Sequence, residues 1–203
     1  MSIHHFAVAG LAAVAIAVGL PLAAQAQSPN LAGASYVGAE FGTGKVSLNC
    51  PANTGCSRVD ASAVVRAGHR FDASWAFEVT YTHIDADWGF LGANYSAAFT
   101  GFGIGAAYTL PLSDSVNLVA RAGGASNELK LQPAVGLTGK NPGTISTNSV
   151  KPYAGIGLSW QFARHWSANL GLDLTRADLR ESSSSAKQGV TVRTAGAGVA
   201  FNF

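Results

Sequence analysis

The chain has 203 residues, only 12% of them charged, and a formal net charge of +2. So small a positive excess excludes nucleic acid as a partner, because a nucleic-acid interface needs a concentrated basic face. The mean hydropathy is +0.20, yet no long apolar run follows the amino-terminal segment, and this excludes a bundle of membrane helices. The 24 glycines favour strands that have one crowded face.

The amino-terminal segment predicts export. An apolar run over residues 7–24 leads into Ala24-Gln25-Ala26, the small-x-small pattern that a signal peptidase cleaves. We expect residues 1–26 to be a signal peptide and residues 27–203 to form one domain. The alternative is an uncleaved membrane anchor, because the run approaches the length of a spanning helix and little positive charge precedes it.

Eight segments of alternating character follow, and each predicts a strand with one apolar face and one small or polar face. They cover residues 35–45, 61–71, 75–84, 98–110, 116–129, 153–162, 166–175 and 190–203. The fourth is the most regular, because large apolar residues alternate with glycine and other small residues. The last places Phe201 and Phe203 on one face and Thr194 and Asn202 on the other.

The connections between these segments alternate between short and long. Short turns are expected at 72–74, 111–115 and 163–165. The long loops are one with the two cysteines, one with Asp85, Asp87 and Trp88, a polar stretch ending at Ser149, and residues 180–189. This order places both chain ends on the short-turn side, as in outer-membrane barrels whose short turns are periplasmic and long loops extracellular.

These features predict an all-β fold, an eight-stranded antiparallel transmembrane β-barrel with up-and-down meander order. Segments of about ten residues cross a bilayer when they are tilted. A closed barrel leaves no unpaired strand edge in lipid. An aromatic girdle is expected at the short-turn end, with members such as Trp75, Trp160 and Trp166. At the other end the candidates are Tyr36, Tyr81, Trp88 and Tyr153.

The two cysteines, Cys50 and Cys56, lie close together in the first long loop. Export to an oxidising compartment predicts a disulfide between them. A ring this small contributes about 2 kcal/mol by chain entropy, so the bond would hold a loop rather than the whole protein. A metal site, the alternative, needs more ligands than are nearby.

The inward positions of the predicted barrel carry three acidic and three basic side chains. They are Glu40, Arg66, Arg70, Glu78, Arg121 and Asp173. An eight-stranded barrel is narrow enough for side chains to fill it, and an unpaired charge in so confined a space is costly. We therefore expect a plug of ion pairs and hydrogen bonds. The alternatives are solvated charges of little consequence and a narrow passive pore.

Basic residues of the loops and rim modestly exceed the nearby acids. Among them Lys130, Lys140 and Lys151 are candidates to contact lipopolysaccharide phosphates, although scattered rim charges are usually solvated.

One local set suggests catalysis. His165-Trp166-Ser167 loosely resembles the catalytic pair of outer-membrane lipid A deacylases, but it falls at a predicted periplasmic turn, away from the outer leaflet. His83 with Asp85 and Asp87 lacks further metal ligands. We predict no enzymatic activity, no metal and no cofactor, with a lipid A-modifying enzyme as the less favoured alternative.

The stretch Lys151-Pro152-Tyr153-Ala154-Gly155-Ile156-Gly157, with Trp166-Ser167-Ala168-Asn169-Leu170-Gly171, resembles the sixth and seventh strands of OmpA-like eight-stranded outer-membrane barrels. Gly68-His69-Arg70-Phe71 and Phe77-Glu78-Val79-Thr80-Tyr81 are similar to the second and third strands, with His69 where an aromatic is more usual. The carboxy-terminal Phe203, with Phe201, resembles the family's signal for the barrel assembly machinery.

The resemblance covers the mature chain and implies an integral outer-membrane protein of a Gram-negative bacterium, folded by that machinery. It implies a role in envelope integrity and surface contact, with outer-membrane lipids and lipopolysaccharide as partners, extracellular loops and both mature ends in the periplasm. We expect a monomer. Because the chain ends at the barrel, we expect no peptidoglycan-binding domain.

Overall fold

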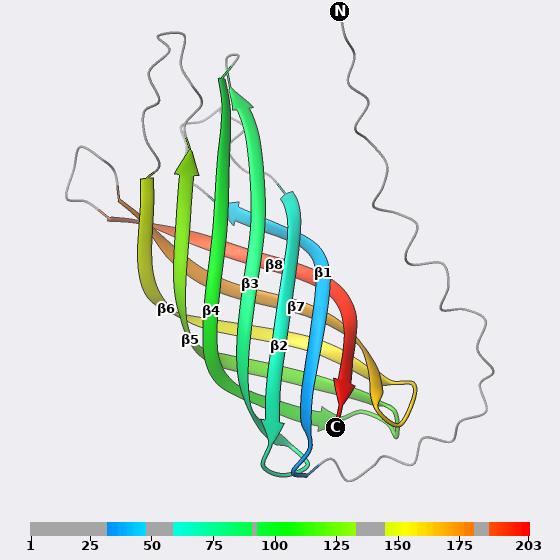
Figure 1. The fold of residues 1–203 in the computed structure, drawn as a ribbon. Helices are drawn as coiled ribbons and strands as arrows, with labels where there is room; N and C mark the ends of the chain where they lie inside the picture. The colour runs from blue at the N-terminus through cyan, green and yellow to red at the C-terminus, as the bar shows by residue number, and fades with distance from the viewer. Residues whose placement is uncertain (1–31, 48–58, 91–92, 133–144, 181–186) are drawn as a thin grey trace, which may run out of the picture.

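The barrel predicted from alternation is confirmed. The computed structural model describes residues 32–47, 59–90, 93–132, 145–180 and 187–203 (Figure 1). In chain order the strands are β1 (Ser35–Ser47), β2 (Val59–Arg70), β3 (Trp75–Phe90), β4 (Ala93–Pro111), β5 (Val116–Gln132), β6 (Ile145–Gln161), β7 (Trp166–Arg180) and β8 (Lys187–Asn202). Each pairs antiparallel with the next, and β8 pairs with β1 to close the barrel. Within the described residues, no helix is long and apolar enough to cross a membrane.

Short turns join β2 to β3, β4 to β5 and β6 to β7 at one end of the barrel, and the carboxy terminus lies at that end too (Figure 1). The start of β1 is there as well, because Ser35 and Phe203 exchange two backbone hydrogen bonds of 2.9 Å. In the β2–β3 turn, Asp72 Oδ1 accepts hydrogen bonds from the backbone amides of Ser74 (2.7 Å) and Trp75 (2.8 Å). These donors hold the pKa of the Asp72 carboxyl below its usual value.

Away from the short turns, several strands run further than predicted. Asp85, Asp87 and Trp88, expected in a long loop, belong to β3 and pair with β4 as far as Phe90. Likewise β6 begins at Ile145, not near residue 153, and β7 continues to Arg180. Alternation weakens here because the outward face no longer meets lipid, whereas backbone hydrogen bonding needs no particular side-chain pattern.

The outward face of the barrel carries a band of exposed apolar side chains. Its members include Phe41, Phe77, Phe102, Ile104, Leu110, Ile156, Leu158, Leu170, Leu172 and Val199. Near the short turns the band ends in packed aromatic rings, with ring centroids 4.9 Å apart for Trp75 and Tyr108 and 5.1 Å for Trp166 and Phe201. Alternation along each strand therefore predicted the outward positions, and aromatic rings gather near the short turns as expected.

Two of the aromatic residues expected in the opposite girdle lie elsewhere. Tyr36 and Tyr153 point into the barrel, and Tyr36 sits near the short turns, where it pairs with Asn202 of β8. The prediction is wrong for both, because the two-residue period of a strand decides the face, and for Tyr36 it is also wrong about the end of the barrel. Tyr81 is exposed on the outer face as expected, and the side chain of Trp88 lies outside the described residues.

Small inward residues allow the walls of the barrel to approach each other closely. At the seam between β1 and β8, a Cβ added to Gly198 would overlap the carbonyl oxygen of Ala39. At Gly124, by contrast, an added Cβ would meet nothing within 4 Å. The first glycine is thus required by packing, and the second is not.

The charged lumen as candidate functional site

Arg66 is the centre of the lumen network, which we define as Tyr36, Glu40, Arg66, Glu78, Arg121 and Asp173. Its guanidinium forms an ion pair with Glu40 Oε1 (Nη1–Oε1 2.6 Å) and a second with Asp173 Oδ2 through Nη2. These three side chains come from β2, β1 and β7, and the Arg66 and Glu40 side chains are 5% and 6% exposed. Arg66 therefore joins strands that are far apart in sequence.

Glu78 forms the second half of the network and is fully buried. Its Oε2 accepts a hydrogen bond of 2.7 Å from the Tyr36 hydroxyl, and its Oε1 lies 3.2 Å from Arg121 Nε. Arg66 Nε is 3.9 Å from the same Oε1, so the two halves are in contact. Carboxylates from three strands thus face guanidiniums from two, with a tyrosine hydroxyl as an additional donor.

Arg70, the sixth charged residue predicted for the lumen, lies beside this network without an ion pair to it. Its Nη1 donates to Thr109 Oγ1 at 3.1 Å, and its guanidinium carbon lies 5.2 Å from the centre of the Tyr36 ring. The ring faces a cation at a distance typical of a cation–π contact. The structure therefore brings five of the six predicted charges into one network and holds the sixth through Tyr36.

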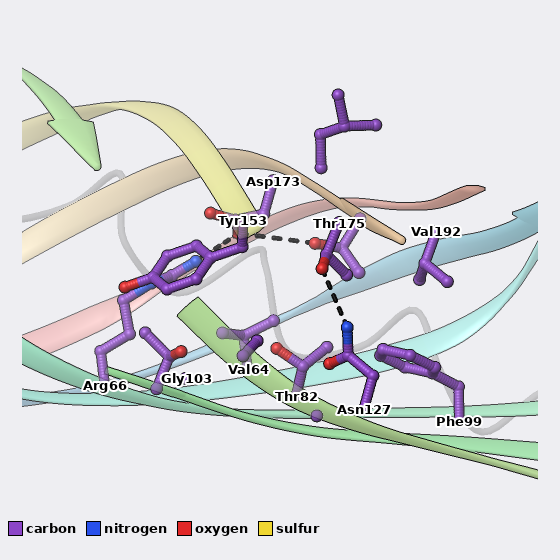
Figure 2. Close-up of a pocket in the computed structure, with 15 residues that line it drawn as sticks. Val64, Arg66, Thr82, Phe99, Gly103, Asn127, Tyr153, Asp173, Thr175 and Val192 are labelled. Atoms are coloured by element: carbon purple, nitrogen blue, oxygen red, sulfur yellow. Dashed lines mark hydrogen bonds and ion pairs between the residues drawn. The ribbon is translucent and has the colours of Figure 1, made fainter. Parts of the chain in front are cut away.

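The space left around the network is small. A cavity of about 30 Å³ lies between Arg66 and Asp173 at one end and Phe99 and Val192 at the other (Figure 2). A second, of about 40 Å³, lies between the network and the short turns and is lined by Arg70 among others. Since one water occupies roughly 10–15 Å³ by this measure, each cavity has room for about two or three water molecules.

Beyond the first cavity, buried apolar side chains from several strands meet inside the barrel. This apolar cluster consists of Val46, Ile84, Phe99, Leu129, Ala177 and Val192, which come from six of the eight strands. Between the cluster and the network, the Asn127 side-chain amide donates to Thr175 Oγ1 at 2.9 Å and to the Arg176 carbonyl at 2.6 Å, across the lumen from β5 to β7 (Figure 2).

Sequence reasoning missed the apolar cluster, Tyr36, Tyr153 and Asn127 as lumen residues. The signal was present, because Ile84 continues the inward series of Glu78, Thr80 and Thr82. Outer-membrane barrels usually have apolar side chains outside and polar ones inside, so an inward Ile84 was not expected. In this part of the lumen the inward side chains are apolar instead.

The predicted rim lysines differ in their surroundings. Lys130 Nζ lies 3.3 Å from Glu128 Oε2, and Lys151 Nζ lies 2.8 Å from Asp178 Oδ1. Each of these lysines is therefore already neutralised by a neighbouring carboxylate. Lys140, Cys50 and Cys56 lie outside the described residues.

The residues considered for catalysis or metal binding are not assembled into a site. Ser167 is buried toward the lumen, whereas His165 is exposed and its Nδ1 lies 2.8 Å from the Asn202 carbonyl oxygen. His83 Nε2 lies 3.2 Å from Asp85 Oδ1 on the outer face, and within the described part of the chain no group of three or more metal-ligating side chains occurs. The remaining predicted residues, Phe201 and Phe203, stack on each other with centroids 6.2 Å apart.

A closed eight-stranded barrel with an apolar outer band and paired charges on its inner face defines a small transmembrane barrel of the outer-membrane type. The chain belongs to the family described as outer membrane protein beta-barrel domain, whose model matches residues 10–203. It is therefore an outer-membrane barrel protein. A search of curated proteins found no match.

Solved structures share the fold at low sequence identity. Neisserial surface protein A has a TM-score of 0.64 and 18% identity, over 84% of this chain and 99% of that one. The attachment invasion locus protein Ail of Yersinia pestis, in complex with the heparin analogue sucrose octasulfate, has a TM-score of 0.58 and 12% identity, over 85% and 99%. OprG from Pseudomonas aeruginosa has a TM-score of 0.54 and 14% identity, over 85% and 96%.

Proposed function

We propose that the protein is a non-conducting, non-enzymatic outer-membrane barrel that contributes to envelope integrity and presents its extended end for surface contacts. The observation that carries this proposal is the placement of Arg66 between Glu40 and Asp173 across the lumen. A continuous water column through the lumen would have to separate these paired charges. Separating them is costly, because each charge would be left unpaired in a confined space. The apolar cluster beyond them disfavours water for a different reason, since it offers no hydrogen-bond partner.

Planar-bilayer conductance of the purified folded protein tests the proposal. We expect no steady openings with the unmodified chain. A steady, large opening would overturn the closed lumen and favour the alternative, a narrow passive pore. Comparing boiled with unboiled samples on a gel provides the control, since a faster unboiled band shows that the protein under test is a folded barrel.

The proposal includes an orientation, with short turns and both mature ends in the periplasm and the extended strands outside. The short turns and the longer, more polar opposite end support it. Removal of residues 1–26, a bond between Cys50 and Cys56, and recognition of Phe201 and Phe203 by the assembly machinery belong to the same proposal. Mass measurement of the mature protein, with and without reductant, tests the first two.

A surface-contact role is supported by the length of the extended end and by the likeness in fold to Ail, whose name describes attachment. Lipopolysaccharide contact through Lys130, Lys140 and Lys151 belongs to the proposal, although Lys130 and Lys151 already have acidic neighbours. Neutralising all three lysines and measuring barrel stability in lipopolysaccharide-containing membranes tests that contact. Replacing His165 and Ser167 should leave lipid A acylation unchanged.

A further inference from the structure

A groove of about 650 Å³ lies on the outer face of the barrel, over β6, β7, β8, β1 and β2. Two neighbouring cross-strand rows form it. One row is Ile156, Leu172, Ala195 and Thr43, and the next is Ala154, Leu174, Arg193, Lys45 and Val59. These positions are outward by alternation, and apart from Thr43 and the two cations their side chains are apolar. Asp173 and Thr194 also line the groove, but both belong to the inward series, and the Asp173 carboxylate is paired with Arg66 in the lumen. Its volume falls within the range of ligand pockets.

The two cations of the groove are unusual neighbours. Lys45 and Arg193 are directly opposite each other on β1 and β8. Like charges in this position repel. Among the described residues neither Lys45 nor Arg193 forms an ion pair, whereas Lys130 and Lys151 each do. A third cation, the exposed Arg176, lies on the same face of β7, just beyond Leu174. The groove therefore has an excess of positive charge that an anion would stabilise.

The position of Lys45 and Arg193 along the barrel axis indicates which kind of anion would bind them. From Phe203 back to Ala195, the outward positions of β8 are apolar, and Arg193 follows at the eleventh residue from the short-turn end. About ten residues of tilted strand cross the apolar core of a bilayer. Lys45 and Arg193 thus lie at headgroup level on the far side of the membrane, while Leu172 and Leu174 lie at or below that level, beside the acyl chains.

We propose that this groove binds a phosphorylated glycolipid of the lipid A class, with phosphate against Lys45 and Arg193 and acyl chains on the apolar floor. Arginine and lysine suit phosphate oxygens, and basic side chains close to a membrane surface attract anionic lipid headgroups. A second copy of the chain fits less well, because a two-fold interface through this patch would bring four cations together. The choice of the outer-leaflet lipid rests on the orientation proposed above.

Native mass spectrometry of the full mature chain in detergent micelles tests the proposal, with diphosphoryl lipid A as the probe. We expect the Lys45→Gln, Arg193→Gln double variant to bind lipid A at least tenfold more weakly than the unmodified chain. The matched control is Arg164→Gln, which removes one exposed cation at the short-turn end, away from the groove, and should stay within about twofold, whereas Arg193→Gln alone should weaken binding several-fold. Heat-modifiable mobility confirms that every variant is folded.

The inference would be overturned by equal binding of a phosphate-free lipid A analogue or of phosphatidylglycerol, by a loss for Arg164→Gln equal to that for Arg193→Gln, or by a dimer that depends on Arg193. Inorganic pyrophosphate alone should bind far more weakly, because it lacks acyl chains; if it matched lipid A, the apolar floor would play no part.

Conductance measured on the same samples separates this result from the proposed function. A conducting barrel that still binds lipid A refutes only the closed lumen, and a closed barrel that does not bind it refutes only the groove.

Discussion

Replacing Arg66 by Met tests whether the lumen network is a set of interdependent charges. The substitution keeps a long side chain but removes the partner of Glu40 and of Asp173, whose side chains are 6% and 20% exposed. Removing one member of a buried ion pair costs about 3–5 kcal/mol, because the remaining charge is left without compensation. Asp173 keeps a hydrogen bond of 3.4 Å from Thr194, so we expect Glu40 to account for most of the loss.

The measurement is urea unfolding of the variant in lipid vesicles, followed by tryptophan fluorescence. The matched comparison is the triple variant Glu40→Gln, Arg66→Met, Asp173→Asn, in which no isolated carboxylate remains. Replacing a whole buried ion triad by uncharged residues of similar volume is often close to neutral, and Glu78 keeps its pair with Arg121, so we expect the triple variant to recover at least half of the loss. A loss below about 1 kcal/mol for Arg66→Met, or no recovery in the triple variant, would refute the reasoning.

Three further predictions concern packing and the turn. Gly198→Ala should destabilise the barrel by about 1–3 kcal/mol through its clash with the β1 carbonyl, whereas Gly124→Ala should change stability little; urea unfolding of the pair decides this. Phe99→Ala should cost about 3–5 kcal/mol in the same assay, and a loss below about 1 kcal/mol would show that the apolar cluster is loosely packed. The pKa of Asp72 measured by carbon NMR should lie below the ordinary value of an aspartate carboxyl, because the backbone amides of Trp75 and Ser74 donate to it. Its contribution to stability should be present above the unfolded-state pKa and disappear as the pH falls through the lower folded-state pKa, an effect that Asp72→Ala abolishes.

Sequence alone predicted the barrel well because lipid and a narrow lumen impose opposite demands on the two faces of every strand. Inside the membrane band this placed Glu40, Arg66 and Glu78 on the inner face, where the structure has them. Which carboxylate meets which guanidinium was not readable, because it depends on the stagger of strands around the barrel. The bond from Arg66 on β2 to Asp173 on β7 joins strands that are not neighbours in the sheet.

Prediction failed in segments where contact with lipid no longer requires an apolar outward face. Beyond the band, Asp85 and Asp87 read as loop residues because their polarity matches that of a loop, yet they continue β3. Tyr36 and Tyr153 were assigned to the outer face because aromatic residues are common at membrane interfaces. In both cases, following the two-residue period of the strand would have given the correct face or element, whereas residue composition gave the wrong one.

The network and the apolar cluster lie one after the other along the lumen, with the cavity of about 30 Å³ between them. In the closed lumen that we propose, an ion or a water column has to pass both, so disrupting either alone should leave the barrel non-conducting. We therefore expect no steady current from the triple variant Glu40→Gln, Arg66→Ala, Asp173→Asn, nor from Phe99→Ala. Their combination should conduct measurably more than either in planar bilayers. A steady current from either variant alone would show that the layer left intact does not close the lumen by itself.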